Sequence, residues 1–427
     1  MADQEPPDFL QANYRHHPML FSEWLIVSAL LFTFLIANGE LLGLKLQQSF
    51  LKHLVGMVMV GASLFDYFGR RLFSAHITKR TGNSLIFWAP LLTLGVLVTV
   101  GSLYARLSLN IEDTFFIIGL YIFVGWTFSL ALQSGNFDRL LSIVFWITLA
   151  ASFATSVVTI WSRLTDFHVL DTAIHEREFF VIPLLYVLFF TDRGTRFFRW
   201  TCIVLIFSAA VASLKNTPTL ILFITLSLSL WRWQVGSSDK NSGAVRKIAL
   251  IYFVVLAAVA AFIGAIMYAN YVKEITPIGN VNFRQHQYTF AWNEFLKSPL
   301  IGSGFTTGTG IDYNLRQDIV MLSNLPTHND ILDILRAGGL VGFTLWFLPL
   351  FIVFGRAALM LRQKALTHQW SEHYDNIGWM LLSSISAVIV YCFNPLLAKT
   401  AFATIVWVFW AFLASMVTSR PMEKNDR

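Results

Sequence analysis

Hydrophobic residues in this chain fall into long continuous runs that short polar segments separate. The runs are about 17 to 25 residues long, which is the length an α-helix needs to cross about 30 Å of hydrocarbon. Because only helices and closed barrels satisfy their backbone hydrogen bonds in lipid, runs of this kind indicate helices. The pattern predicts an all-α polytopic membrane protein with about twelve transmembrane helices. The predicted spans are 22–43, 53–69, 84–105, 114–133, 139–161, 178–191, 197–213, 217–232, 247–270, 338–360, 376–394 and 400–418.

The longest polar stretch, residues 271–337, lies between the ninth and tenth predicted spans. Most Lys and Arg residues of the shorter connections fall on the side that is cytoplasmic if the N-terminus is inside, and the positive-inside rule favours that orientation. We therefore expect a single membrane domain, residues 1–427, with both termini cytoplasmic and 271–337 as one large periplasmic loop. The first 20 residues lack the basic start and cleavage site of a signal peptide, so we expect an uncleaved first span.

Composition excludes an ordinary soluble domain. Only 13% of the residues are charged and 56% are hydrophobic, whereas soluble chains carry about 25% charged residues. The formal net charge of +6 does not indicate a nucleic-acid partner, because basic residues in membrane proteins mostly set orientation. Both cysteines, Cys202 and Cys392, fall inside predicted spans, where we expect packed thiols.

Ionisable residues on the predicted outer side are concentrated in the segment 162–178 and in the large loop. Lys215 adds a charge at the outer mouth between spans seven and eight. Charged groups at membrane depth are costly and usually face a partner or a polar cavity. Basic groups that converge there would bind an anion. At a membrane surface, an anion attached to an apolar chain is a lipid phosphate or diphosphate.

The stretch PTHNDILDILRAGGLVGF, residues 326–343, interrupts this apolar context. Thr327 followed three residues later by Asp330 resembles a capping-box helix start, and Gly338 and Gly339 are expected to stop or reorient that helix. Three charged residues share the face opposite its apolar residues, and we interpret them as helix-face charges rather than metal ligands: Asp330, Asp333 and Arg336.

This reading places His328 and Asn329 at a helix N-terminus, where free amides and the helix dipole favour negative charge. A neutral imidazole there could accept a proton from an incoming hydroxyl beside a bound phosphate. From spacing alone, a surface histidine in a capping turn is the alternative interpretation.

Two motifs extend the picture beyond spacing. His328-Asn329 is followed by nine residues, Gly339, two residues and Gly342, and Arg284 precedes an aromatic helix that ends in SPLIGSG. Together they resemble the O-antigen ligase and polysaccharide polymerase superfamily of Wzy_C-type membrane proteins. The specific resemblance covers roughly 280–345, and the superfamily's bundle of about twelve spans with a late periplasmic loop matches the hydropathy reading.

The resemblance implies glycosyl transfer with inversion from an undecaprenyl-diphosphate-linked glycan to a sugar hydroxyl. It assigns His328 as the general base and Arg284 as the holder of the diphosphate, since a guanidinium matches phosphate oxygens with forked hydrogen bonds. The family usually has an arginine in a Ser-Arg-small motif, where this chain has Lys215. Arg177 is a candidate to compensate for that arginine. Further candidate substrate-binding residues are Asn329, Tyr288 and Trp292.

We expect no cofactor and no metal, because a polyprenyl diphosphate is already a good leaving group and cations can stabilise it. The first outer loop, 44–52, contains no acid that could hold a divalent ion, and the pair Glu176 and Glu178 is a weak alternative.

The predicted function is an inner-membrane glycan transferase of surface polysaccharide biosynthesis, and Lys215 favours an exopolysaccharide or O-antigen polymerase. An O-antigen ligase that uses a lipid A-core acceptor is the first alternative, and a non-enzymatic flippase or transporter is the second. Predicted partners are the lipid-linked donor, a glycan or lipid A-core acceptor, membrane lipid, and flippase and chain-length regulator proteins. The predicted location is the bacterial inner membrane.

Overall fold

The computed structural model describes most of the predicted spans and parts of the segment between spans nine and ten. The described residues are 21–39, 49–73, 87–101, 114–132, 137–165, 174, 176–191, 193–213, 215–236, 280–304, 310–314, 319–323, 329–367, 370–393, 396 and 400–418.

Helices occupy the predicted spans wherever the structure describes them, and the predicted span 247–270 lies outside the described residues. Predicted span 178–191 is divided into two short helices, because Pro183 lacks the N–H that would continue the first one. The helices are α1 (Phe21–Gly39), α2 (Ser49–Phe73), a helix at Phe87–Gly101, α4 (Thr114–Ala131), α5 (Phe137–Leu164), α6 (Glu178–Val181), α7 (Leu184–Phe190), α8 (Arg196–Ala212), α9 (Asn216–Gly236), α11 (Asn280–Lys297), α12 (Asp330–Leu366), α13 (Glu372–Tyr391) and α14 (Thr400–Thr418).

Several of these helices have the character of membrane spans. Among the described residues, four are long and apolar enough to cross a membrane: Phe21–Gly39, Phe137–Leu164, Asp330–Leu366 and Ala401–Thr418. Shorter apolar helices accompany them at Leu54–Gly69, Phe87–Gly101, Gly119–Ala131 and Glu178–Phe190. The prediction of a helical, polytopic membrane protein is therefore confirmed at this level.

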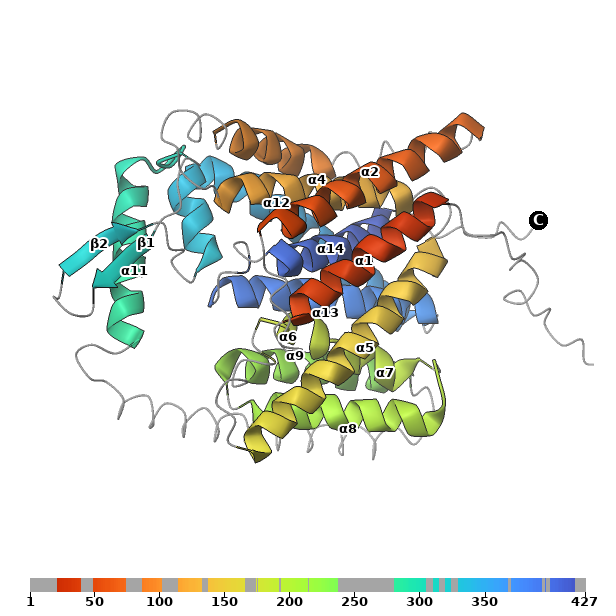
Figure 1. Cartoon of the computed structure of the whole chain (residues 1–427). Helices are drawn as coiled ribbons and strands as arrows, with labels where there is room; N and C mark the ends of the chain where they lie inside the picture. The colour runs from red at the N-terminus through yellow and green to blue at the C-terminus, as the bar shows by residue number, and fades with distance from the viewer. Residues whose placement is uncertain are drawn as a thin grey trace, which may run out of the picture.

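Helix α14 forms the centre of the bundle. It packs against α1, α2, α4, α12 and α13, and Figure 1 shows it in the interior behind α1. Its residues are apolar on every side, which is typical of a helix surrounded by other helices. Trp407 and Trp410 are buried there, and both rings contact Trp88 of the helix Phe87–Gly101. Trp407 also contacts Trp346 of α12.

Ion pairs tie helices together at the end of the bundle that holds the start of α1. Arg139 at the start of α5 contacts Glu23 at the start of α1, with Nη1 and Oε2 3.2 Å apart. At the start of α13, Glu372 pairs with Arg193 at 2.7 Å and Asp375 pairs with Arg232 at 2.8 Å.

Contacts at the opposite end join residues that were predicted to lie outside. Arg163 at the end of α5 donates from Nη2 to the carbonyl of Ser213, at the end of α8, over 2.9 Å. Arg177, before α6, donates to the carbonyl of Ala37, at the end of α1. Residues predicted to share one side of the membrane thus meet, and the contacts agree with the predicted alternation of these spans.

Helix α11 and a two-stranded hairpin lie beyond one end of the bundle. Figure 1 shows α11 running across that end, roughly perpendicular to α1, α13 and α14. Strands β1 (Gly310–Asn314) and β2 (Ile319–Ser323) pair in antiparallel fashion, with Gly310 opposite Ser323 and Asn314 opposite Ile319. The prediction of an all-α fold did not include this hairpin.

An elbow in α12 connects α11 to the bundle. The helix bends at Gly339, which has φ 59° and ψ −160°, a backbone region that essentially only glycine adopts. The loop after α11 fits into the bend: Ser303 N and Gly304 N donate to the carbonyls of Arg336 and Ala337, each over 2.9 Å. The predicted change of direction at the glycine pair is confirmed.

The loop also receives hydrogen bonds from the far side of the bend. Leu340 N and Val341 N donate to the carbonyls of Pro299 and Leu300, over 2.9 and 3.0 Å. A Cβ atom at Gly339 would lie 2.5 Å from the carbonyl carbon of Leu300, so no side chain fits between the two backbones. Gly302 has φ +70° and meets the backbone of Arg336 and Ala337 in the same way.

We expect Gly339→Ala to destabilise the protein. Adopting this backbone region costs alanine about 1–3 kcal/mol, and its Cβ would overlap the loop. Thermal unfolding in detergent, followed by fluorescence-detected size exclusion, measures the effect. Gly355→Ala is the matched control in the same helix, since a Cβ there meets nothing within 4 Å. Equal midpoints for the two variants would contradict the close approach.

Candidate functional site

In the first two turns of α12, the charged face points toward the interior of the protein. Asp330, Asp333 and Arg336 are 2%, 6% and 6% exposed, whereas Ile331 and Leu335 on the supposedly apolar face are partly exposed. Buried charges require compensating charges or hydrogen bonds. The interpretation of these three residues as helix-face charges is therefore incomplete, because they face the interior of the protein rather than solvent.

Asn329 determines where α12 begins. Its backbone is extended, with φ −147° and ψ 94°, and its Oδ1 accepts a hydrogen bond from Leu332 N over 3.0 Å. This is an N-cap, which satisfies one of the free amides of the first turn. The helix begins two residues later than a cap at Thr327 predicts, with Asn329 as the cap, while His328 and Thr327 lie outside the described residues. Asn329 thus has a structural role in addition to its predicted contact with substrate.

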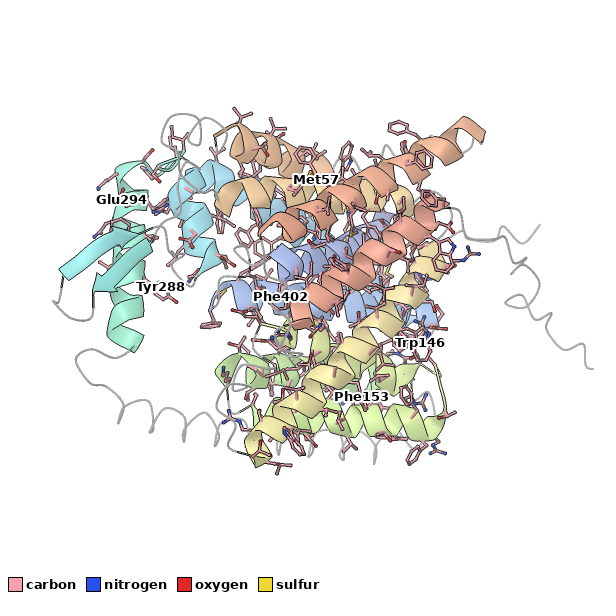
Figure 2. The ribbon with its side chains drawn as sticks, viewed as in Figure 1. Met57, Trp146, Phe153, Tyr288, Glu294 and Phe402 are labelled. Atoms are coloured by element: carbon pink, nitrogen blue, oxygen red, sulfur yellow. The ribbon has the colours of Figure 1, made fainter. Side chains whose placement is uncertain are left out.

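Helix α11 carries Arg284, Tyr288 and Trp292 at intervals of four residues, which places them along one side of the helix. The side chain of Arg284 lies outside the described set. Tyr288 is partly buried and Trp292 is exposed, and the ring of Trp292 lies 5.2 Å from that of Phe295. Figure 2 shows Tyr288 and Glu294 on this helix.

An electrostatic interaction relates α11 to α12. Burial disfavours the positive charge of Arg336, whereas Asp333 on its own helix and Glu294 on α11 favour it, and Glu294 also forms an ion pair with Lys297. Arg336 Nε is buried and has no hydrogen-bond partner among the described residues. Sequence reasoning missed the Glu294–Arg336 relation, because the two residues lie on different helices and nothing in the spacing pairs them.

The buried start of α12 also lies near the end of α13. Asp330 is close enough to Tyr391 for its negative charge to act on the phenol, and Tyr391 is 2% exposed. Its hydroxyl has no hydrogen-bond partner among the described residues. The helix start that follows the predicted base is thus packed against the membrane bundle rather than projecting into solvent.

Arg177 occupies a packed position between α1 and α14. It is 4% exposed, and Nε and Nη2 donate to the carbonyl of Ala37 over 3.2 and 2.7 Å. The guanidinium also lies over the ring of Phe402, 5.2 Å from its centroid, and Figure 2 places Phe402 at the end of the bundle nearer α11. These contacts fix Arg177 at the end of the bundle where the outer residues gather.

Lys215 lies in the turn between α8 and α9, partly buried. Its carbonyl accepts hydrogen bonds from Thr219 N and Thr219 Oγ1 over 3.3 and 2.8 Å, which anchors the first turn of α9. Glu178 is fully buried and lies within the electrostatic reach of Lys215, Arg177 and Glu176. The structure therefore brings Lys215 and Arg177 together around one carboxyl group.

Glu178 itself is an unusual group. Neither of its carboxylate oxygens has a hydrogen-bond partner among the described residues, and Glu176 before it has a positive φ of 66°. Within the part of the chain that the structure describes, no group of three or more His, Cys, Asp or Glu side chains could hold a metal ion.

Groups of both signs gather at the end of the bundle that α11 crosses. The N-terminus of α12, Lys215 and the buried Arg177 favour negative charge there, and Glu178, Asp330 and Asp333 are buried carboxyl groups. Tyr288 of α11 lies at the same end (Figure 2).

Comparison with protein families identifies the segment that carries both motifs. Residues 201–347 match the family model Wzy_C, described as O-antigen ligase. The comparison with curated proteins found no match. The matched segment runs from α8 through α9 and α11 to the elbow of α12, so it includes Lys215, Arg284 and His328. Residues 201–347 are therefore similar to the O-antigen ligase family, the resemblance that the two sequence motifs predicted.

Proposed function

We propose that this protein is an inner-membrane glycan transferase that moves a glycan from undecaprenyl diphosphate to a sugar hydroxyl at the periplasmic face. The observation that carries the proposal is the elbow, where backbone hydrogen bonds join SPLIGSG to the residues on both sides of Gly339 in the His-Asn motif. The family match covers both motifs. Two segments that the resemblance assigns to donor and acceptor chemistry thus belong to one rigid unit.

In the proposed reaction, His328 takes the proton of the acceptor hydroxyl onto a ring nitrogen. The hydroxyl oxygen forms a bond to the anomeric carbon from the face opposite the diphosphate, and the bond to the diphosphate oxygen breaks with its electron pair. The product is inverted, and the polyprenyl diphosphate leaves with the added negative charge. General base catalysis of this kind contributes about 10²–10⁴-fold.

Cations stabilise the charge that develops on the leaving group. Arg284 is proposed to hold the diphosphate with forked hydrogen bonds, and Lys215 to act as a point charge at the start of α9. Positioned charges in a site shielded from water stabilise a transition state without reorganisation. Arg177, which is fixed by Ala37 and Phe402, adds positive potential. Tyr288, Trp292 and Asn329 are proposed to contact the glycan.

We favour a polymerase of exopolysaccharide or O-antigen, because Lys215 stands where the family usually has an arginine. The description of the matching family as O-antigen ligase supports the alternative of transfer to lipid A-core. In either case the donor, the acceptor glycan and membrane lipid are the partners, with flippase and chain-length regulator proteins acting before and beside this step.

We expect His328→Ala to abolish glycan assembly, with a loss of about 10²–10⁴-fold in transfer, because the acceptor hydroxyl then lacks its base. A deletion strain that carries the wild-type or variant gene is examined for lipopolysaccharide banding and secreted polysaccharide. An O-chain reduced to a single repeat indicates O-antigen polymerase, loss of capped core indicates ligase, and loss of secreted polysaccharide alone indicates exopolysaccharide polymerase.

His168→Ala is the matched control, since that histidine lies in another predicted outer loop. Membrane content of each variant is measured by immunoblot. Normal glycan assembly by a membrane-inserted His328→Ala protein would overturn the enzyme proposal and favour a transporter.

Lys215→Ala is expected to weaken donor use by about 10- to 100-fold in kcat/KM, the effect of losing one charged hydrogen bond. Lys215→Arg should retain most of the activity, because the guanidinium supplies the same charge. Transfer by purified protein at varied donor concentration measures both. Equal loss in the two variants would show that Lys215 is needed for packing of the turn rather than for phosphate binding.

The contact between α11 and α12 predicts non-additive effects. Arg336→Met and Glu294→Gln should each lower transfer by about 3- to 100-fold, the range for groups that act through a shared contact. Glu294→Gln should add little in the Arg336→Met protein. Lys297→Met is the control, since Lys297 is an exposed partner of Glu294. Additive losses would mean that the two residues act independently.

A further inference from the structure

Five large apolar side chains at the elbow are exposed. Leu296, Leu300, Ile301, Leu340 and Val341 are 55%, 65%, 71%, 47% and 47% exposed, and we call them the elbow patch. Three come from the end of α11 and its following loop, and two come from α12 just after the bend. Contiguous exposed apolar surface of this kind marks an interaction site.

The members of the patch are adjacent in space and held there by backbone hydrogen bonds. Val341 N donates to the carbonyl of Leu300 over 3.0 Å, and Leu340 N donates to that of Pro299 over 2.9 Å. Leu296 lies in the last turn of α11, immediately before this loop. The patch is therefore a fixed surface of the folded elbow.

The patch continues the lipid-facing side of α12. Beyond the bend, Leu348, Phe351, Ile352 and Leu359 are 50%, 56%, 42% and 55% exposed, in a helix long and apolar enough to cross a membrane. Leu340, Val341 and these four residues recur at the spacing of one helix face. Because the elbow patch continues the exposed apolar side of α12, we expect lipid to surround both.

The orientation of α11 agrees with contact to a bilayer. Figure 1 shows it lying across the end of the bundle, roughly perpendicular to the helices that run through it, so it is close to parallel with a membrane plane. Lys297, with a side chain that is 69% exposed, stands next to Leu296. A lysine beside an apolar face is typical of helices at a membrane interface, where the ammonium group reaches the headgroups.

We propose that the elbow patch is inserted into the bilayer leaflet at this end of the bundle, so that α11 rests on the membrane as an interfacial helix. The occupant of the patch is lipid, with acyl chains against Leu300 and Ile301 and headgroups at Lys297. The proposal concerns the exposed apolar residues of the elbow and does not depend on the transferase activity.

Depth measurement by spin labelling tests the proposal. Single cysteines at Leu300 and Ile301, in protein with Cys202→Ser and Cys392→Ser, carry a nitroxide in lipid nanodiscs. We expect both labels to lie about 5–10 Å below the headgroups, accessible to oxygen and protected from a water-soluble nickel complex. Phe351→Cys on the exposed side of α12 is the lipid reference, and Ser371→Cys, exposed at the other end of the bundle, is the aqueous reference.

Two results would overturn the proposal. One is access of the nickel complex to positions 300 and 301 equal to that at 371. The other is dipolar broadening between labels, which would mean that a second copy of the chain covers the patch. A photoreactive benzophenone residue at Leu300, in protein that keeps both native cysteines, provides a second measurement. It should crosslink to phospholipid, and a crosslinked protein dimer would again contradict the proposal.

Discussion

The close approach of two glycine backbones at the elbow is the constraint on which this end of the molecule depends. Gly302 and Gly339 both have positive φ, and each lies where a Cβ would overlap the other segment's backbone. Four hydrogen bonds, two on each side of the bend, then join the loop to α12. Because the loop ends α11, this lock fixes the helix that carries Arg284 relative to the helix that begins after His328.

The lock also explains how charged residues of α12 come to be buried. The segment before Gly339 packs against α11 and buries Asp333 and Arg336, with Glu294 close enough for its charge to act on Arg336. Burying such groups is unfavourable unless opposite charges accompany them, and a partnered set is tolerated. Glu178 is also buried, with Lys215 and Arg177 within electrostatic reach but no hydrogen bond to its carboxyl oxygens among the described residues. Both groupings lie at the end of the bundle that α11 crosses (Figure 1), whereas the ion pairs of Glu23, Glu372 and Asp375 lie at the other end.

Hydropathy predicted the described membrane helices well, because in lipid the backbone N–H and C=O groups must form hydrogen bonds within the protein, and a helix is one of the few structures that allows this. The glycine pair at 338–339 also revealed the bend, since glycine is the residue that the required backbone angles demand. Periodicity indicated that Asp330, Asp333 and Arg336 share a face, but it could not show which face is inside. That depends on α11, whose contacting residue Glu294 lies far away in the sequence. The break at Pro183 and the hairpin β1–β2 depended on local geometry that hydropathy does not describe.

The depth of the elbow in the membrane determines where Arg284 lies relative to a lipid-linked diphosphate. A lipid-linked diphosphate lies at the membrane interface, because its charged group stays hydrated while its chain stays in hydrocarbon. If the elbow patch is in the acyl region and Lys297 is at the headgroups, α11 lies at the level of such a diphosphate. Arg284 on α11 and the N-terminus of α12 then meet the phosphate where it already sits, without drawing it into water. If α11 lay outside the leaflet, the diphosphate would have to leave the membrane interface before Arg284 could bind it.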